Sequence, residues 1–396
     1  MKSIVIVNPV RYTGYGYINI IKNFFKDYYL IGLWPSDNHK LSGYNRALHL
    51  LDEEIVHSNF DDTVNLLQKY NVQCFLVGDC AAFPLADKLQ SYFFPELCND
   101  PDKQVYRNSK FDYLNYLKTK SIVDTTQFLL TQDTLDQCRN QTLVVKPVNG
   151  AGNIDVHIKP DFNTISNLVN SDTIYMVQDY VDGEEFCIEM SSYMGLHKCT
   201  MASVYKGEYL VDNIFPWREE NELIDSTHPY MKILYEYVVT ILDALGVRIG
   251  LTWTQVKIKN GTPHLVEINF RSQGRAVVGP IHAVTNNNWA LDSLKSYLNI
   301  NTHNKNNMMY KKLGDFNKIC INNYTERYIE NLDMSNIKKL DSFDYYEERH
   351  NLFPGIIPVT KNFPSVMGMI MIHNNNLDRY TNDMNVINTW KKMVCK

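Results

Sequence analysis

Residues 251–271 read LTWTQVKIKNGTPHLVEINFR, and this stretch carries the strongest structural signal in the chain. Its two halves, Leu251–Ile258 and His264–Asn269, are rich in apolar and β-branched residues. The segment Lys259-Asn260-Gly261 between them holds the Asn-Gly pair that is typical of a tight hairpin turn. The sequence therefore predicts an antiparallel β-hairpin that leads into the polar end of this stretch.

The predicted hairpin gathers side chains that suit a divalent cation. Glu267 and Asn269 are two residues apart, so they share one face of a strand, and Gln255 on the partner strand can join them. One carboxylate and two amide oxygens suit Mg²⁺ that also binds phosphates, because magnesium takes hard oxygen ligands. Arg271 follows and can face the negative charge that develops in phosphoryl or acyl transfer. For the Glu–Asn pair alone, a solvated strand face is the alternative.

Two earlier segments offer further contacts for a nucleotide. Lys146 ends a predicted strand and precedes a loop with Gly150 and Gly152, which presents an ammonium and bare backbone amides to phosphate. A hairpin turn with a solvated lysine is an equal alternative for this segment alone. In 178–185 a strand enters a hinge whose backbone can meet an adenine edge, while Glu185 can accept from ribose hydroxyls. An ordinary acidic turn is the alternative there.

The first hundred residues alternate strand and helix signals. Strands are expected at Ile4–Val7, Leu30–Leu33 and Cys74–Val77, with a loop holding Gly14 and Gly16 and then a helix over 17–25. Short apolar strands that alternate with helices imply a parallel sheet with helical crossovers. The Gly14-x-Gly16 pair lacks the third glycine of a dinucleotide-binding loop, so we expect no such site.

The pattern changes from about residue 105 onward, where strands begin to follow one another directly. Helices are expected over 108–120 and 230–245, and strands over 143–146, 154–158, 175–181, 185–190 and 200–204. After about residue 305, an Asn-rich bridge leads into a third stretch with strand signals at 353–357 and 366–372. The chain therefore changes from α/β to α+β character.

Composition excludes several classes of protein. The 396 residues are 44% hydrophobic and 21% charged, a length that suggests two or three domains. A net charge of −5 argues against a protein that coats nucleic acid, and no run approaches the ~18–20 apolar residues that span a bilayer. Because Met1 leads directly into an apolar strand, we expect no leader peptide and a cytoplasmic protein. The eight scattered cysteines form no C-x-x-C pair, so reduced thiols and no zinc site are expected.

With these motifs in order, residues 105–300 resemble the ATP-grasp superfamily. The correspondence follows the order of the chain. Two lysines, Lys110 and Lys146, resemble the nucleotide lysines of the superfamily, and its phosphate loop is matched by Gly150, Gly152 and Asn153. Its adenine hinge is matched by Gln178, Asp179, Tyr180 and Val181, the glutamate of its G-x-E step by Glu185, its metal ligands by Gln255, Glu267 and Asn269, and its catalytic arginine by Arg271. Each motif alone is weak, but their order and spacing together are specific.

The resemblance implies an α/β (α+β) ATP-grasp fold in three parts. These are an N-terminal parallel α/β domain over 1–100, a central lid over 101–205, and a C-terminal α+β domain with the metal site over 206–396. Two departures stand out. Gln255 replaces the usual first metal glutamate, as in carbamoyl phosphate synthetases, and Asp155 brings a negative charge near the expected phosphates.

The resemblance also implies a reaction that uses ATP with Mg²⁺, or with Mn²⁺ in its place. A carboxylate attacks the γ-phosphorus, ADP leaves, and an amine attacks the acyl phosphate while Arg271 steadies the oxyanion. Within the superfamily the chain is most similar to the bacterial L-amino-acid ligases, which join two amino acids into a dipeptide, often for a peptide antibiotic. His228 and Arg275 would then lie near the acceptor pocket, and a role at the start of a helix is the alternative for His228.

Other functions stay open at this point. One is another ATP-grasp ligase, of the purine-pathway or carboxylating type, and a second is a nucleotide-binding regulator that has lost turnover. The expected partners are free amino acids, with no nucleic acid and no membrane, and a homodimer is an open alternative. A basic amino acid such as arginine would suit Glu184 and Glu189, but the sequence does not name the substrate.

Overall fold

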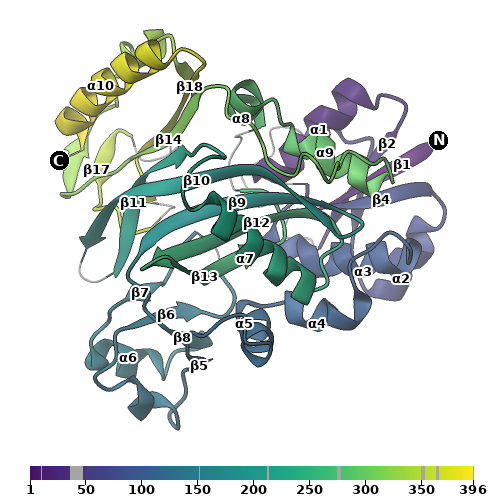
Figure 1. Ribbon diagram of the computed structural model, residues 1–396, viewed down its shortest axis with the longest axis horizontal. Helices are drawn as coiled ribbons and strands as arrows, with labels where there is room; N and C mark the ends of the chain where they lie inside the picture. Colours follow the sequence, from purple (N-terminus) through teal and green to yellow (C-terminus); the bar gives the residue numbers. More distant parts are fainter. Residues whose placement is uncertain are drawn as a thin grey trace.

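The computed structural model describes residues 1–9, 11–35, 48–150, 152–211, 214–273, 278–348, 353–362 and 365–395. The N-terminal part is a parallel sheet in the order β3-β2-β1-β4, with helices between its strands (Figure 1). Its elements are β1 (Lys2–Val7), α1 (Arg11–Phe24), β2 (Tyr29–Trp34), η2 (Leu48–Leu50), β3 (Glu53–Val56), α2 (Phe60–Leu67), β4 (Asn71–Val77), η3 (Cys80–Ala82) and α3 (Phe83–Phe93). The parallel α/β character predicted from the sequence is confirmed.

The loop predicted around Gly14 and Gly16 is wrong, because both glycines lie inside α1. A Cβ at Gly14 would lie 2.5 Å from the carbonyl oxygen of Pro9. Glycine is therefore needed at this position so that the helix can approach the end of β1, and not in order to form a loop.

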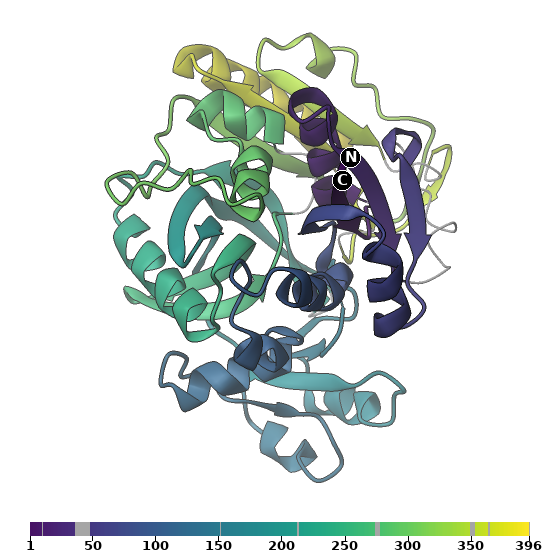
Figure 2. The same ribbon diagram turned by 90° about the vertical axis from the view of Figure 1, so that its right-hand side faces the viewer.

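The rest of the molecule is organised on one large antiparallel sheet. Its main path runs β13-β12-β9-β10-β11-β7-β6-β8-β5. The strands are β5 (Gln127–Leu129), β6 (Leu143–Pro147), β7 (His157–Ile158), β8 (Tyr175–Asp179), β9 (Glu184–Tyr193), β10 (Leu196–Val211), β11 (Ile214–Leu223), β12 (Ile249–Lys259) and β13 (Thr262–Asn269). Turned by 90°, β5–β8 project from one end of the molecule, away from the N-terminal and C-terminal parts (Figure 2).

The β12–β13 hairpin forms as the sequence predicts. The register pairs Gln255 with Glu267 and Trp253 with Asn269. At the turn Asn260 has φ 51° and Gly261 has φ 79°. Two consecutive positive φ values are what an Asn-Gly hairpin turn requires.

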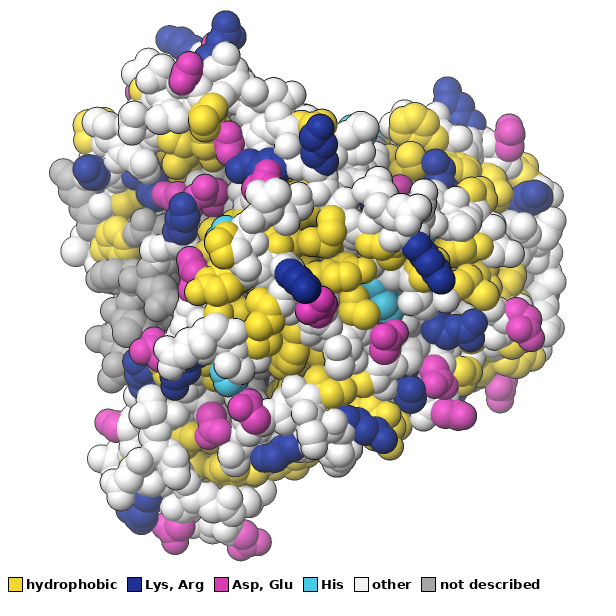
Figure 3. Space-filling view, viewed as in Figure 1, with side chains coloured by type: hydrophobic (Ala, Val, Ile, Leu, Met, Phe, Trp, Pro, Cys, Tyr) yellow, Lys and Arg dark blue, Asp and Glu magenta, His cyan; other side chains and the backbone are white. Residues whose placement is uncertain are grey.

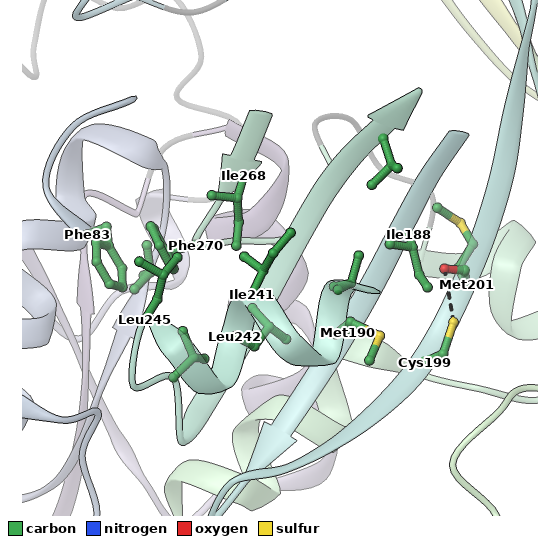
Figure 4. Close-up of a cluster of buried hydrophobic side chains, with 14 of the residues drawn as sticks. Phe83, Ile188, Met190, Cys199, Met201, Ile241, Leu242, Leu245, Ile268 and Phe270 are labelled. Carbon is green, nitrogen blue, oxygen red and sulfur yellow. Dashed lines mark hydrogen bonds between the residues drawn. The ribbon is translucent and has the colours of Figure 1, made fainter. Parts of the chain in front are cut away.

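One face of the large sheet is covered by α7 (Met231–Ala244), which lies in front of β9 and β12 in Figure 1. Ile188 and Met190 of β9 belong to the same buried cluster as Ile241 and Leu242 of this helix (Figure 4). Side chains alternate along a strand, so Glu189 and its neighbours at every second position face the opposite side of the sheet. The polar face is therefore separated from the helix-covered core.

Several strands differ from the sequence prediction. Only His157–Ile158 of the strand expected over 154–158 forms, because Asn153 and Asp155 take φ values of 58° and 60°. The strands β3, β5 and β11 were not predicted at all. β11 contains the polar run REEN, and a partly polar strand lacks the apolar run on which the prediction depends.

The connecting and C-terminal elements complete the fold. They are η4 (Pro101–Lys103), α4 (Gln104–Arg107), α5 (Lys110–Thr119), η5 (Leu135–Cys138), α6 (Phe162–Leu168), α8 (Val278–Thr285), α9 (Trp289–Tyr297), β14 (Asp315–Ile321), β15 (Arg327–Ile329), η6 (Ile337–Lys339), β16 (Phe343–Glu348), β17 (Gly355–Ile357), β18 (Gly368–Asn374) and α10 (Leu377–Val394). β14, β18 and β16 extend the large sheet from β11, while β15 and β17 pair separately. The division into three domains stays a prediction, and β10 runs across its expected boundary at 205 and 206.

Two further features concern the surface charges and the helices. On the face shown in Figure 3, basic and acidic side chains are interspersed over the surface. Within the described ranges, no helix combines the length and apolarity that a membrane span needs.

Candidate active site

The three side chains predicted as metal ligands lie together on the hairpin. Gln255 and Glu267 are register partners, and Asn269 Nδ2 donates to Glu267 Oε1 at 3.0 Å. In the described part of the chain, no group of three or more His, Cys, Asp or Glu side chains could hold a metal ion. A cation at this hairpin would therefore depend on amide oxygens and on a ligand that brings its own oxygens.

Lys110 connects three of the predicted segments. It is the first residue of α5, whose start is capped by Ser109 accepting from the backbone N–H of Asp112 at 3.1 Å. Its Nζ lies 3.3 Å from Glu267 Oε1 and donates to the Gly150 carbonyl oxygen at 3.1 Å. The helix start, the glycine loop and the hairpin thus meet at one ammonium group.

Lys146 is buried, which excludes the alternative of a solvated lysine in a hairpin turn. It lies within β6 with 7% of its surface exposed, and its Nζ donates to Gln178 Oε1 at 2.8 Å and to the Val266 carbonyl at 3.3 Å. Burial, together with the nearby charge of Lys110, lowers the pKa of Lys146 to about 8. Glu267 acts in the opposite direction and favours the charged form.

The positive charges of Lys110 and Lys146 keep the carboxyl group of Glu267 ionised. Burial by itself would raise the pKa of this carboxyl, but Lys110 and Lys146 together with the amide of Asn269 hold the pKa below its ordinary value. The ammonium groups of Lys110 and Lys146 thus lie side by side at this carboxylate. Two neighbouring positive charges suit a polyanion such as a phosphate chain.

The acidic residue of the segment predicted to bind phosphate is already engaged by its neighbours. Gly152 and Asn153 have φ values of 71° and 58°, a left-handed conformation that suits glycine and asparagine. Asp155 accepts hydrogen bonds from Tyr175 and, at 3.0 Å from Oδ1, pairs with His157 Nε2. Its carboxylate therefore serves the structure of the loop itself.

The hinge residues begin at the end of β8, which contains Gln178 and Asp179, and lead toward β9. Gln178 accepts from Lys146, and Asp179 Oδ2 accepts from the Thr126 backbone N–H at 2.7 Å. The Tyr180 ring has the Lys159 ammonium 4.2 Å from its centroid. Val181 completes this hinge, which comes before the chain turns at residue 183.

The G-x-E step is explained by a close approach of two strands. A Cβ at Gly183 would lie 2.4 Å from the carbonyl oxygen of Ile258, so glycine is required there. Two residues later, Glu185 is buried on β9 and pairs in register with Lys257 of β12. Glu185 and Glu267 both favour the charged form of Lys146, so they lie within its electrostatic reach.

Arg271 lies at the end of the hairpin against the N-terminal part of the molecule. Its Nε donates to Cys80 Sγ at 2.7 Å, and its guanidinium carbon lies 5.7 Å from the centroid of the Trp253 ring. Cys80 in turn donates to Asn269 Oδ1 at 3.1 Å. Sequence reasoning missed Cys80, whose only signal is its place just after a parallel strand, where ligands commonly bind.

Glu189 does not fit the role suggested for it with a basic substrate. Its side chain is fully buried and accepts from Ser272 Oγ at 2.7 Å, the Gln273 backbone N–H at 2.9 Å and Thr200 Oγ1 at 3.2 Å. Burial nevertheless raises the pKa of this carboxyl. Glu189 anchors the segment that follows Arg271, while Glu184, the other residue suggested, is exposed at the start of β9.

Gln273 is a second residue that sequence reasoning missed. Only 3% of its surface is exposed, and neither its amide nitrogen nor its amide oxygen has a hydrogen-bond partner within the described ranges. Buried amides are normally paired, and in the described part of the chain those of Asn221 and Asn322 are unpaired as well, so the place of Gln273 two residues after Arg271 is what distinguishes it. Gln273 continues the two-residue spacing of Asn269 and Arg271, and this spacing was a signal that could have identified it.

The two residues predicted near an acceptor pocket have different outcomes. The expectation for His228 is wrong in its location, because its ring packs 5.6 Å from the Phe186 ring. Phe186 alternates with Glu185 along β9 and belongs to the core with α7, so His228 lies on the opposite face from the hairpin ligands. Arg275 lies outside the described residues.

Comparisons with known proteins agree with this fold. No family model matches the sequence. Dapdiamide A synthase of Enterobacter agglomerans is 26% identical over 249 residues, and the match spans 58% of each of the two chains. An L-amino acid ligase from Bacillus licheniformis superimposes with a TM-score of 0.75 at 14% identity, over 98% of this chain and 97% of that one.

A further solved structure has the same architecture. It is the N5-carboxyaminoimidazole synthase of Aspergillus clavatus, in complex with ADP and 5-aminoimidazole ribonucleotide, with a TM-score of 0.69 at 9% identity over 99% of both chains. The chain has the ATP-grasp fold and is similar to the L-amino-acid ligases that share it.

Proposed function

We propose that the chain is an ATP-dependent ligase that joins an amino-acid carboxylate to an amine through an acyl phosphate, releasing ADP and phosphate. One observation carries the proposal. Lys110 of α5, Lys146 of β6, Glu267 and Asn269 of β13, and Arg271 just after that strand form one connected cluster. Two ammonium groups and a guanidinium are the side chains that bind the oxygens of a nucleotide triphosphate, and the carboxylates of Glu267 and Glu185 lie beside them.

The lysines are proposed to hold the phosphates of ATP, which is a substrate here. Lys146 is fixed by Gln178 and Val266, so its charge is already oriented before ATP binds. Lys110 reaches the Gly150 carbonyl, which places a second charge beside the glycine loop. The hinge 178–181 with Glu185 is proposed to hold the adenosine part, because it starts at the end of β8, the strand that pairs with β6 beside Lys146.

A magnesium ion fits the hairpin residues as a companion of the phosphates. Glu267 is ionised, and Gln255 and Asn269 add amide oxygens on the same strand face. When bound, Mg²⁺ would neutralise phosphate charge and polarise the transferred group. Glu267 would hold it most strongly, because it is the only carboxylate of the three.

The proposed reaction needs no side-chain nucleophile. A substrate carboxylate oxygen attacks the γ-phosphorus, the bond to the β-phosphate oxygen breaks, and ADP leaves. An amine then attacks the carbonyl carbon, phosphate leaves, and the amine nitrogen loses its proton. Arg271 lies at the end of the hairpin and is proposed to stabilise the oxyanion of the tetrahedral intermediate. The Gln273 amide, two residues on, is proposed to contact the acyl substrate.

The relatives support free amino acids as the substrates. One sequence relative is a dapdiamide A synthase and one structural neighbour is an L-amino acid ligase. The proposal includes a dipeptide-type product, a role in making a peptide antibiotic and action in the cytoplasm. The main rival is a carboxylating ligase, which is favoured by the likeness to an N5-carboxyaminoimidazole synthase.

The test is product analysis with the purified full chain. With MgATP and a panel of single amino acids and pairs, we expect ADP and phosphate to form only with certain pairs, together with a dipeptide detected by mass spectrometry. ADP formation that requires bicarbonate would support the carboxylating rival. AMP as the product would exclude the acyl-phosphate route. No product above the level of Glu267→Gln would indicate a regulator.

A further inference from the structure

Two segments that are far apart in the sequence meet beside the proposed site. Residues 78–83 follow strand β4, and residues 269–273 follow the hairpin. Phe83 and Phe270 stack with their ring centroids 4.5 Å apart and an interplanar angle of 21°. Cys80 makes the polar contacts of the same junction, with Arg271 Nε at 2.7 Å and Asn269 Oδ1 at 3.1 Å. The aromatic stack therefore holds the two segments at a fixed separation.

The segment that carries Cys80 is itself held in place. A Cβ at Gly78 would lie 1.9 Å from the Asn8 carbonyl oxygen, so only glycine fits at this position. Asp79 Oδ2 accepts from Asn8 Nδ2 at 2.9 Å, and its Oδ1 accepts from the Ala82 backbone N–H at 3.0 Å. Cys80 thus comes from a loop whose backbone is anchored on both sides.

The contacts of Cys80 continue into the metal strand. Arg271 donates to Cys80, Cys80 donates to Asn269, and Asn269 Nδ2 donates to Glu267 at 3.0 Å. The thiol is an acceptor for one catalytic group and a donor to the next, so it sets the direction in which both point. Of the eight cysteines, Cys80 and Cys395 are the two that are partly exposed, and Cys80 contacts the cluster through Arg271 and Asn269.

We propose that Cys80 is a positioning residue of the ligase, which orients the Arg271 guanidinium and the Asn269 amide from the N-terminal part of the molecule. This inference rests on the proposed function. It means that the catalytic geometry is complete only when the N-terminal sheet is seated against the hairpin. A serine hydroxyl at this position can still accept and donate a hydrogen bond, although its C–O bond is shorter than the C–S bond of cysteine. An alanine side chain can do neither.

The first test is a kinetic comparison of Cys80→Ala, Cys80→Ser and a matched control, Cys98→Ala. Cys98 is buried in the same part of the molecule, where its thiol donates to the backbone carbonyl of Pro95 at 3.2 Å. We expect Cys80→Ala to lower kcat by roughly 10²-fold, as for a misplaced catalytic group, and to raise the Mg²⁺ concentration needed for half-maximal rate. KM for ATP should change little, and Cys80→Ser should recover much of the loss. Equal kcat and Mg²⁺ dependence in Cys80→Ala and Cys98→Ala would overturn the proposal.

The second test does not depend on turnover. The wild-type chain is treated with iodoacetamide at fixed pH, with and without MgADP, and modification of each cysteine is followed by peptide mass spectrometry. We expect MgADP to slow modification of Cys80 severalfold and to leave Cys395 unchanged. An equal rate at Cys80 in both conditions would contradict its place beside the metal strand. A protected Cys80 in a chain without ligase activity would refute the proposed function alone.

Discussion

Lys146 shows how one buried charge can serve binding at a cost to stability. Its ammonium is surrounded by β6, β8 and β13, and burial lowers its pKa to about 8. A lysine with a lowered pKa destabilises the folded state at neutral pH, because the charged form is favoured in the unfolded chain. That cost is consistent with a group kept for binding an anion rather than for folding.

We expect ADP affinity to fall as the pH rises through about 8, because the protonated lysine binds phosphate and the neutral one does not. Between pH 7 and pH 9 the loss should reach roughly tenfold, the decrease in the protonated fraction of a group with this pKa. Calorimetry at both pH values measures it. Lys146→Met should bind weakly at both, and a parallel pH dependence in that variant would assign the titration to another group.

The hairpin ligands should tolerate substitution in a defined order. Glu267→Gln removes the only carboxylate of the set and should lower Mg²⁺-dependent ADP formation by ~10²-fold or more. Gln255→Glu keeps an oxygen in place and should have a mild effect. Glu236→Gln on the exposed side of α7 is the control, and thermal unfolding checks that each variant folds. The reverse ranking would show that the nucleotide lies elsewhere.

At the scale of elements, the β12–β13 hairpin is the unit that combines fold and site. Its turn chemistry brings the two strands together, and the two-residue side-chain period then places Gln255, Glu267 and Asn269 on one face. Strand β9 supports this hairpin, because it pairs with β12 along its length. A substitution in the turn should therefore destabilise the hairpin without changing the side chains proposed to act in catalysis.

Gly261→Ala tests the turn. Gly261 has φ 79° with open space around its Cβ position, so the expected cost of about 1–2 kcal/mol comes from backbone conformation alone. The thermal midpoint should fall while kcat of the folded protein stays unchanged. Gly279→Ala is the matched control, because that glycine lies in α8, also with open space and without a positive φ. Equal midpoints for the two variants would show that the turn does not limit stability.

At the scale of the whole molecule, one buried ion pair joins the N-terminal part to the segment before β12. Arg107 Nη2 lies 2.7 Å from Asp87 Oδ2, and Arg107 Nη1 donates to the Leu245 carbonyl at 2.8 Å. Both charged side chains are almost fully buried. The pair therefore links α3, α4 and the end of α7.

Asp87→Ala should destabilise the protein by about 3–5 kcal/mol, because it leaves a buried guanidinium without its carboxylate. Asp341→Ala, which breaks the exposed pair with Arg379 at 3.2 Å, should cost no more than about 1 kcal/mol. Chemical denaturation of both variants measures the difference. Similar losses would mean that the junction does not depend on the buried pair.

Histidines make overall stability depend on pH. Burial lowers the pKa of His197 and His303, so the folded state disfavours their protonation while the unfolded chain takes up protons near pH 6.5. Their contribution to stability is present above about pH 6.5 and is lost as the pH falls below it. The thermal midpoint should fall less between pH 7 and pH 5.5 in His197→Gln than in wild type. His282→Gln, exposed on α8, is the control and should follow wild type.

The sequence by itself determined the features that depend on neighbours along the chain. The Asn-Gly turn, the two-residue spacing of Glu267 and Asn269, and the alternation of strands and helices in the first hundred residues are local signals, and the structure confirms them. The position of Lys110 at the start of a helix is local in the same sense, since Ser109 caps that helix. Short-range geometry is enough to predict such features.

Only the tertiary structure decided which side chains are buried and which face of the sheet they share. Lys146 is enclosed by three strands, Glu189 is bound by the segment after Arg271, and His228 lies on the helix-covered face. Cys80 contacts residues that are 189 and 191 positions away. Burial and long-range contact follow from how sheets pack, and packing is set by the whole chain, so no local pattern encodes it.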